Sequence, residues 1–260
     1  MPGVNVTTSA RSGPVAPLRA SSGQAFFIGQ TERGPADVAV RLRSFSDYTS
    51  VFGSRVNYGF LYDSVKTFFE EGGEQCYIGR TVGNAATVGT VTLSDQAVAP
   101  LSTLRFDAAN AGAWSSGVSI VIADGSLADT YKVSVVIAGD TVESVNNIST
   151  PLAAVGAFST SNYVRATNLG SVTAAPNNNP VNGAFALSAG ADDRAAIVLA
   201  DYEDALELFT QGLGDGAVAA PGLGSTVHTA LETHASANRR VALLSQIGRA
   251  SCRERVCYAV

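Results

Sequence analysis

The chain has 260 residues, of which 46% are hydrophobic and 15% charged, and its net charge is −5. An acidic chain is a poor candidate for direct binding to nucleic acid, and no apolar stretch reaches the roughly 18 residues that a membrane span needs. The N-terminus lacks the basic-then-apolar pattern of a secretory signal. We therefore expect a globular protein made in a cytoplasm, with one large or two modest domains. Its charged fraction is below the usual quarter, which suggests that much surface is covered by something other than water, such as neighbouring subunits.

The first 22 residues are rich in Ser, Thr, Pro, Gly and Ala, with a short alternation at Val4 and Val6. Such a segment cannot build a hydrophobic core by itself. We interpret residues 1–22 as an extended arm, and a disordered tail is the alternative.

The next part of the chain has the pattern of a strand–helix–strand unit. Residues 25–29 (AFFIG) form an apolar run ended by glycine, which predicts a strand buried on both faces. Gly34 and Pro35 predict a turn, and Ser44 is placed to cap a short helix that runs through Tyr48.

A second helix follows in the same part of the chain. Four apolar side chains recur at i, i+4, i+7 and i+8 and define one helix face: Leu61, Val65, Phe68 and Phe69. Gly72 stands where a C-terminal cap glycine belongs, and residues 76–82 read as the next strand. This order predicts an α/β crossover unit.

From residue 84 to residue 183, glycine, alanine and β-branched residues dominate. Residues 118–122 and 131–137 predict strands, and Gly139-Asp140 predicts the turn of a hairpin whose second strand covers residues 141–145. We interpret the region as a β-rich domain inserted into the α/β domain. Residues 174–183, which contain three asparagines and Pro180, are the predicted return linker.

The helical period returns after residue 187. One apolar face combines four side chains: Tyr202, Ala205, Leu206 and Phe209. Asp201 is the predicted N-cap of this helix and Gly212 its predicted end. A strand at 217–222, a helix at 227–237 and a strand at 240–245 complete the pattern.

The last residues have a different origin. Residues 247–256 (IGRASCRERV) resemble the conceptual translation of a sequencing adaptor, so residues 247–260 are excluded from fold reasoning; a genuine basic tail is the alternative. The exclusion changes the net charge from −5 to −7 and leaves Cys76 as the only cysteine, which rules out an internal disulfide. We expect the genuine sequence to stop near Gln246, within a domain.

Candidate sites of chemistry are weak. Residues 222–226 (GLGST) join a predicted strand to a helix, as a phosphate loop would, but lack the P-loop lysine and the third glycine of the dinucleotide motif. His228 and His234 are six residues apart, so they point to different helix faces and do not form a metal-binding pair.

Three other features are also read as structural. Cys76 lies in an apolar strand, which predicts a buried, inert thiol. The pairs Asp192-Asp193 and Glu70-Glu71 are read as solvated helix ends, the second at a helix C-terminus, where anions are unfavourable. We predict no catalytic, cofactor-binding or metal-binding residues.

The ordered series of these motifs resembles contractile tail sheath proteins from about Gly23 to Gln246, most weakly through the inserted region. No single motif is specific, and Ala111-Gly112 stands where the family usually has Pro-Gly. The motifs are residues 26–29 (FFIG), 31–35 (TERGP), 44–48 (SFSDY), 51–53 (VFG), 61–69 (LYDSVKTFF), 76–80 (CYIGR), 110–117 (NAGAWSSG), 142–149 (VESVNNIS) and 202–245.

The resemblance implies a fold of mixed α+β and α/β class. A discontinuous α/β core domain, residues 23–83 and 184–246, would carry the inserted β-rich domain at residues 84–183. The arm at residues 1–22 would add a strand to a neighbouring subunit, with Val4 and Val6 as the inter-subunit residues.

The resemblance also implies a mechanical function. Subunits would associate with one another as stacked rings around a tail tube protein, in contact with baseplate and tail terminator proteins. Rearranged packing between subunits would then shorten the cylinder and drive the tube through the host envelope, without nucleotide or cofactor. The implied location is the virion tail, after assembly in the host cytoplasm. A chain that stops near Gln246 would leave a sheet edge unpaired, so we expect that this fragment does not form a contractile cylinder by itself.

Two other functions stay open at this point. Residues 84–183 fit a β-rich adhesion or receptor-binding module of a virion. The turn at residues 222–224 fits an α/β enzyme that binds a nucleotide or a phosphorylated substrate.

Overall fold

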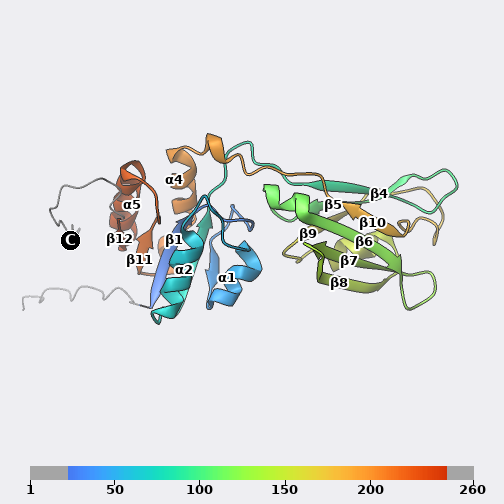
Figure 1. Cartoon of the computed structure of the whole chain (residues 1–260), viewed down its shortest axis with the longest axis horizontal. Coiled ribbons are helices and arrows are strands. Elements are labelled where there is room, and N and C mark those ends of the chain that lie inside the picture. The colour runs from blue at the N-terminus through green and yellow to red at the C-terminus, as the bar shows by residue number, and fades with distance from the viewer. Residues whose placement is uncertain (1–22, 245–260) are drawn as a thin grey trace, which may run out of the picture.

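The computed structural model describes residues 23–244. Val4, Val6 and the adaptor-like segment lie outside the described residues. The fold is a mixture of helices and three sheets, arranged as two lobes (Figure 1). We call residues 23–80 and 194–244 the α/β lobe, and residues 90–186 the β-rich lobe. None of the helices in the described part has the length and apolar content of a membrane span.

The α/β lobe is built on a five-stranded sheet with the order β12-β11-β1-β3-β2. The central strand, β1 (Gln24–Gly29), is buried at all six positions and pairs in parallel with β3 (Gln75–Arg80) and β11 (Ala217–Ala219). β12 (Val241–Leu243) continues the parallel order, and β2 (Val40–Leu42) closes the other edge antiparallel to β3. A strand with helices on both faces needs apolar residues at every position, which explains the continuous run in β1.

Helices cover both faces of this sheet. Phe27 of β1 shares a core cluster with residues of α1 (Phe45–Phe52) and α2 (Leu61–Glu70), whereas Phe26 shares one with residues of α4 (Leu199–Glu207) and α5 (Ser225–Asn238). Successive strand residues point to opposite faces, so the two pairs of helices lie on opposite sides of β1. Gly72, with φ of 90°, follows the end of α2 as predicted.

Ser44 caps α1 as predicted, although the helix runs four residues further than Tyr48. The Ser44 hydroxyl accepts a hydrogen bond from the backbone N–H of Asp47 at 3.1 Å.

Replacing Ser44 with alanine is expected to lower the free energy of unfolding by about 1 kcal/mol, because the first turn of α1 loses an acceptor for one of its free N–H groups. Urea unfolding measures the change. Ser46→Ala is the control, since the cap hydrogen bond is made by the Ser44 hydroxyl and not by that of Ser46, and a Ser44 variant as stable as this control would contradict the assignment.

The start and end of α4 differ from the prediction. The helix begins at Leu199, with Val198 as its N-cap, and Asp201 acts from the first turn by accepting a hydrogen bond from the Val198 N–H at 2.7 Å. Asp201 thus satisfies the N–H of the N-cap residue itself, as the acidic residue of a capping box does. The helix ends at Glu207, and Gly212 lies in a separate 3-10 turn, Gln211–Leu213.

The β-rich lobe contains two antiparallel sheets that enclose one core. The first has the order β10-β6-β7-β8 and the second β4-β5-β9. The strands are β4 (Thr90–Ser94), β5 (Ser102–Ala108), β6 (Val118–Asp124), β7 (Tyr131–Ile137), β8 (Asp140–Ile148), β9 (Val164–Asn168) and β10 (Gly183–Ala186), and helix α3 covers Pro151–Ala157. A single cluster of buried residues draws from both sheets and from α3. The second sheet and α3 were not predicted from the sequence.

Two details of this lobe correct the sequence prediction. The hairpin turn is centred on Ala138 and Gly139, with φ of 52° and 92°, and Asp140 already pairs with Ile137. Two positive φ values are the geometry that matches the twist of a two-residue hairpin. Residues 183–186, predicted as the end of a linker and the start of the α/β part, form β10 and pair with β6.

Candidate functional site

The two lobes are joined by two chain segments that run side by side. The outgoing segment, residues 81–89, and the return segment, residues 187–193, are bonded by a pair of backbone hydrogen bonds between Thr87 and Ala191, at 2.8 and 3.0 Å. The Gly83 N–H also donates to the Asp192 carbonyl at 3.0 Å. These bonds make the connection a short two-stranded ribbon rather than two independent linkers.

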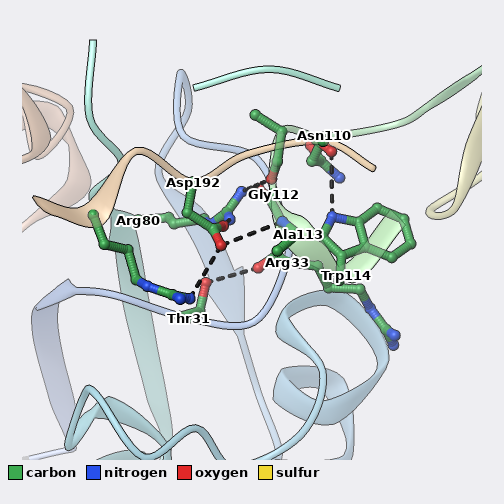
Figure 2. A network of polar contacts seen from close by, with 12 residues as sticks. Thr31, Arg33, Arg80, Asn110, Gly112, Ala113, Trp114 and Asp192 are labelled. Carbon is green, nitrogen blue, oxygen red and sulfur yellow. Dashed lines mark hydrogen bonds and ion pairs between the residues drawn. The ribbon is translucent and has the colours of Figure 1, made fainter. Parts of the chain in front are cut away.

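A buried ion pair stands at the base of this ribbon (Figure 2). Arg80, the last residue of β3, has a side chain that is 1% exposed, and its Nη2 lies 2.9 Å from Oδ1 of Asp192. Its Nη1 donates to the carbonyl oxygens of Gly34 at 2.7 Å and Ala111 at 2.8 Å. One guanidinium therefore joins a loop of the α/β lobe, the segment that precedes β6 and the return segment.

Arg80 stays charged in spite of its burial. Burial lowers the pKa of Arg80, and the negative charge of Asp192 acts in the opposite direction. Arginine starts from a pKa above 12, so the side chain stays protonated at neutral pH.

The second oxygen of Asp192 is paired as well. Oδ2 accepts hydrogen bonds from the Ala113 N–H at 3.3 Å and from Arg194 Nη1 at 3.2 Å, and the Arg194 guanidinium carbon lies 3.9 Å from the ring centroid of Tyr58. The interpretation of Asp192-Asp193 as a solvated helix end is therefore wrong for Asp192. Its 7% exposure and the three hydrogen bonds that its carboxylate accepts place it in the interior, where a carboxylate needs such partners.

Arg33 makes a second contact between the lobes. It donates to the carbonyl oxygens of Thr49 and Ser50 at 3.2 Å each, at the end of α1. Its guanidinium carbon lies 5.9 Å from the ring centroid of Trp114 and 5.1 Å from that of Tyr163, both of the β-rich lobe. The Trp114 Nε1–H donates to the Asn110 carbonyl, which fixes the indole (Figure 2). Cation–π attraction thus adds to the ion pair in holding the lobes together.

Two glycines permit this close approach of backbones. Gly112 has φ of 141°, which L side chains rarely adopt. A Cβ at Gly190 would lie 2.5 Å from the Thr87 carbonyl oxygen. Any side chain at Gly190 would therefore push the two segments of the ribbon apart.

Sequence comparison and structure comparison with known proteins give different results for this chain. No protein-family model and no curated protein matches the chain. Among solved structures, the sheath tail protein of Listeria innocua matches 85% of this chain with a TM-score of 0.58 at 14% identity. That of Desulfitobacterium hafniense matches 91% with a TM-score of 0.53 at 16% identity.

The chain has the fold of sheath tail proteins. It spans 44% and 50% of the lengths of these two solved proteins. The resemblance expected from the order of the motifs is therefore confirmed by an independent comparison of structures.

Within this fold, the weak phosphate-loop candidate at residues 222–226 is packed at its first residue, Gly222. It joins β11 to α5 as expected, with φ of 76° at Gly222. A Cβ at Gly222 would lie 2.1 Å from the ring of Phe60, so that ring rests directly on the turn.

Cys76 is buried in the core of the α/β lobe, as predicted. Burial raises the pKa of its thiol to about 12, so the sulfur is protonated at neutral pH and is a poor nucleophile. In the part of the chain that the structure describes, no group of three or more His, Cys, Asp or Glu side chains is arranged to hold a metal ion.

His234 is a packing residue of the sheath fold. Its ring lies against Phe209, and its Nε2 is 2.8 Å from Nη1 of Arg240, whose guanidinium also covers the ring of Phe26. A guanidinium can only donate, so Nε2 must carry a lone pair and the imidazole must be neutral. Burial, followed by the charge of Arg240, lowers the pKa of His234 to about 4.

This shift predicts a loss of stability in acid. The unfolded chain takes up a proton on this histidine near pH 6.5, whereas the folded chain does so only near pH 4, so the contribution to stability falls as pH drops from about 6.5 to about 4. Melting temperatures of the wild type and His234→Gln at pH 7 and pH 4.5 measure it. The wild type should lose more than the variant on acidification, and equal losses would contradict the neutral, Arg240-bonded imidazole.

Proposed function

We propose that the chain is a structural subunit of a contractile tail sheath, which polymerises around a tail tube and contracts to drive the tube through a host envelope. The observation that carries the proposal is the fold shared with a sheath tail protein over 85% of this chain. At 14% identity the match cannot come from sequence similarity alone, and it agrees with the motif order from residue 23 to residue 246.

The junction between the lobes supports a mechanical role. A subunit that changes its packing against neighbours must transmit force from one end to the other without bending in the middle. Here two backbone segments, the Arg80–Asp192 pair and the Arg33 contacts resist such bending. The proposal needs no catalytic residue and no cofactor, because the energy would be stored in contacts between subunits.

The proposal also includes the domain boundaries, the partners and the location of the protein. Residues 1–22 would be the linking arm, residues 23–83 and 184–246 the core domain, and residues 84–183 the inserted domain. The partners would be further copies of the chain, the tail tube protein, and the baseplate and terminator proteins, with assembly in the host cytoplasm and final location in the virion tail.

Immunogold electron microscopy tests the proposal against the adhesion alternative. Antibodies raised against the chain would be applied to tailed particles from the cells that carry its gene. Gold along the whole length of the tail cylinder is the expected result. Gold confined to fibres or to the tip of the tail would assign the chain to adhesion, and particles without gold would overturn a role in the tail.

A further inference from the structure

The two lobes have separate hydrophobic cores. In the part of the chain that the structure describes, one cluster of buried apolar residues belongs to the β-rich lobe and the adjoining Leu187. The other two clusters lie wholly in the α/β lobe, one on each face of its sheet. None of the three bridges the junction. Domains that share no large hydrophobic interface are expected to move relative to one another, so by default these lobes would turn about the ribbon that joins them.

Two arginines of the α/β lobe make the direct polar and ring contacts between the lobes, within residues 23–244. Arg80 donates to the Ala111 carbonyl, and the guanidinium of Arg33 lies over the rings of Trp114 and Tyr163 (Figure 2). The β-rich lobe is therefore attached at two places besides the backbone of the ribbon.

The two attachments differ in their position relative to the ribbon. Arg80 directly precedes the outgoing segment, and its ion-pair partner Asp192 lies in the return segment, so this pair is at the base of the ribbon, where a hinge would turn. Arg33 lies in the loop between β1 and β2, and Trp114 and Tyr163 belong to neither segment of the ribbon. The Arg33 contact is thus a separate attachment away from the base.

Arg33 is fixed to its own lobe. Its backbone N–H donates to the Phe52 carbonyl at 3.2 Å, and its Nη2 donates to the carbonyls of Thr49 and Ser50. Its own carbonyl accepts a hydrogen bond from the Thr31 hydroxyl at 2.7 Å. The last carbonyls of a helix form the negative end of the helix dipole, where a cation is favourable. The guanidinium therefore keeps its place at the end of α1.

The two rings are fixed to the other lobe. Trp114 lies in a 3-10 turn, Ala113–Gly117, and its Nε1–H donates to the Asn110 carbonyl at 3.3 Å. The Tyr163 carbonyl accepts a hydrogen bond from the Ala109 N–H at 2.8 Å. Both rings also pack against the hydrophobic core of the β-rich lobe. Because each side of the contact is anchored to its own lobe, the contact can fix the orientation of one lobe relative to the other.

We propose that Arg33 locks the two lobes in one orientation, and that without its contact the ribbon acts as a hinge. The Arg80–Asp192 pair opposes separation of the lobes, but it lies at the base of the ribbon and leaves rotation about that base free. A second attachment away from the base removes this freedom. Cation–π attraction is lost once the cation moves beyond about 6 Å from the ring centroid, so any large rotation breaks the Arg33 contact. The lock is a property of the single chain and does not depend on the proposed sheath function.

Residual dipolar couplings of the backbone N–H groups, measured on the whole chain in a weakly aligning medium, test the lock. One alignment tensor should fit both lobes of the wild type. Arg33→Met keeps much of the side-chain volume but removes the charge and the donors, and this variant should lose the common tensor, so that each lobe needs its own. A single tensor that still fits both lobes of Arg33→Met would overturn the proposal, as would a wild type that needs two.

A matched control is Arg41→Met. Arg41 is an exposed arginine in β2 of the same lobe, and its guanidinium donates to Gln75 Oε1 within that lobe. This variant removes the same charge without touching the junction and should keep the common tensor. Equal effects of Arg33→Met and Arg41→Met would show that the lobes respond to net charge, which would overturn the assignment to Arg33.

Trp114→Leu tests the same contact from the other lobe and serves if Arg33→Met does not fold. It removes one of the two rings, so the tensors of the two lobes should again differ. The double variant Arg33→Met with Trp114→Leu should separate the tensors no further than Arg33→Met alone, because both changes act on one contact. Effects that add in the double variant, or a common tensor in Trp114→Leu, would contradict the lock.

Discussion

Replacing Arg80 with methionine is expected to lower the free energy of unfolding by roughly 3–5 kcal/mol, because the buried Asp192 carboxylate loses its buried charged partner and keeps only the partly exposed Arg194. Methionine keeps much of the volume of the side chain, so the loss comes mainly from Asp192 and from the Gly34 and Ala111 carbonyls that Arg80 bonds. Urea unfolding followed by circular dichroism measures the change.

The control for this prediction is a pair of the same kind at the surface. Arg55 and Asp63 lie 2.8 Å apart with side chains that are 63% and 43% exposed. Arg55→Met should cost less than about 1 kcal/mol, because water screens the pair and solvates the remaining carboxylate. A loss from Arg80→Met as small as that from Arg55→Met would show that the junction does not stabilise the fold.

The second large effect is expected in the core of the β-rich lobe. Phe158, which follows the last residue of α3, is fully buried and packs edge-to-face on Phe106 of β5, with ring centroids 5.5 Å apart. Phe158→Ala should lower the free energy of unfolding by roughly 3–5 kcal/mol through lost contacts and the cavity that remains.

The same helix supplies the control for Phe158. Leu152 lies in α3 but is 66% exposed, so Leu152→Ala should change the free energy of unfolding by at most about 0.5 kcal/mol. If the two substitutions cost the same, α3 does not anchor to the core of this lobe through Phe158.

Elements with a strong local pattern were predictable from the sequence. The run of apolar residues in β1, the apolar face of α2 and the alternation in β6 and β7 each depend on residues close together in the chain. The β4, β5 and β9 strands carry fewer such signals: β4 is buried at only one of its five positions, and α3 is a short run of small residues without a clear apolar period.

The junction could not be predicted by the same means. Arg80 and Asp192 are 112 residues apart, and nothing local distinguishes a buried, paired aspartate from one at a solvated helix end. The signal that the sequence does hold is Arg80 itself, a charged residue at the end of a buried strand. Burial of an arginine requires acceptors nearby, which predicts a partner but not which residue supplies it.

Negative-stain electron microscopy tests most directly the proposal that this chain builds a contractile sheath. The sample is the protein as its natural gene encodes it, produced together with the tail tube protein from the same locus. Hollow cylinders of stacked rings around the tube are the predicted result. Soluble monomers that stay apart from the tube protein would contradict the sheath function.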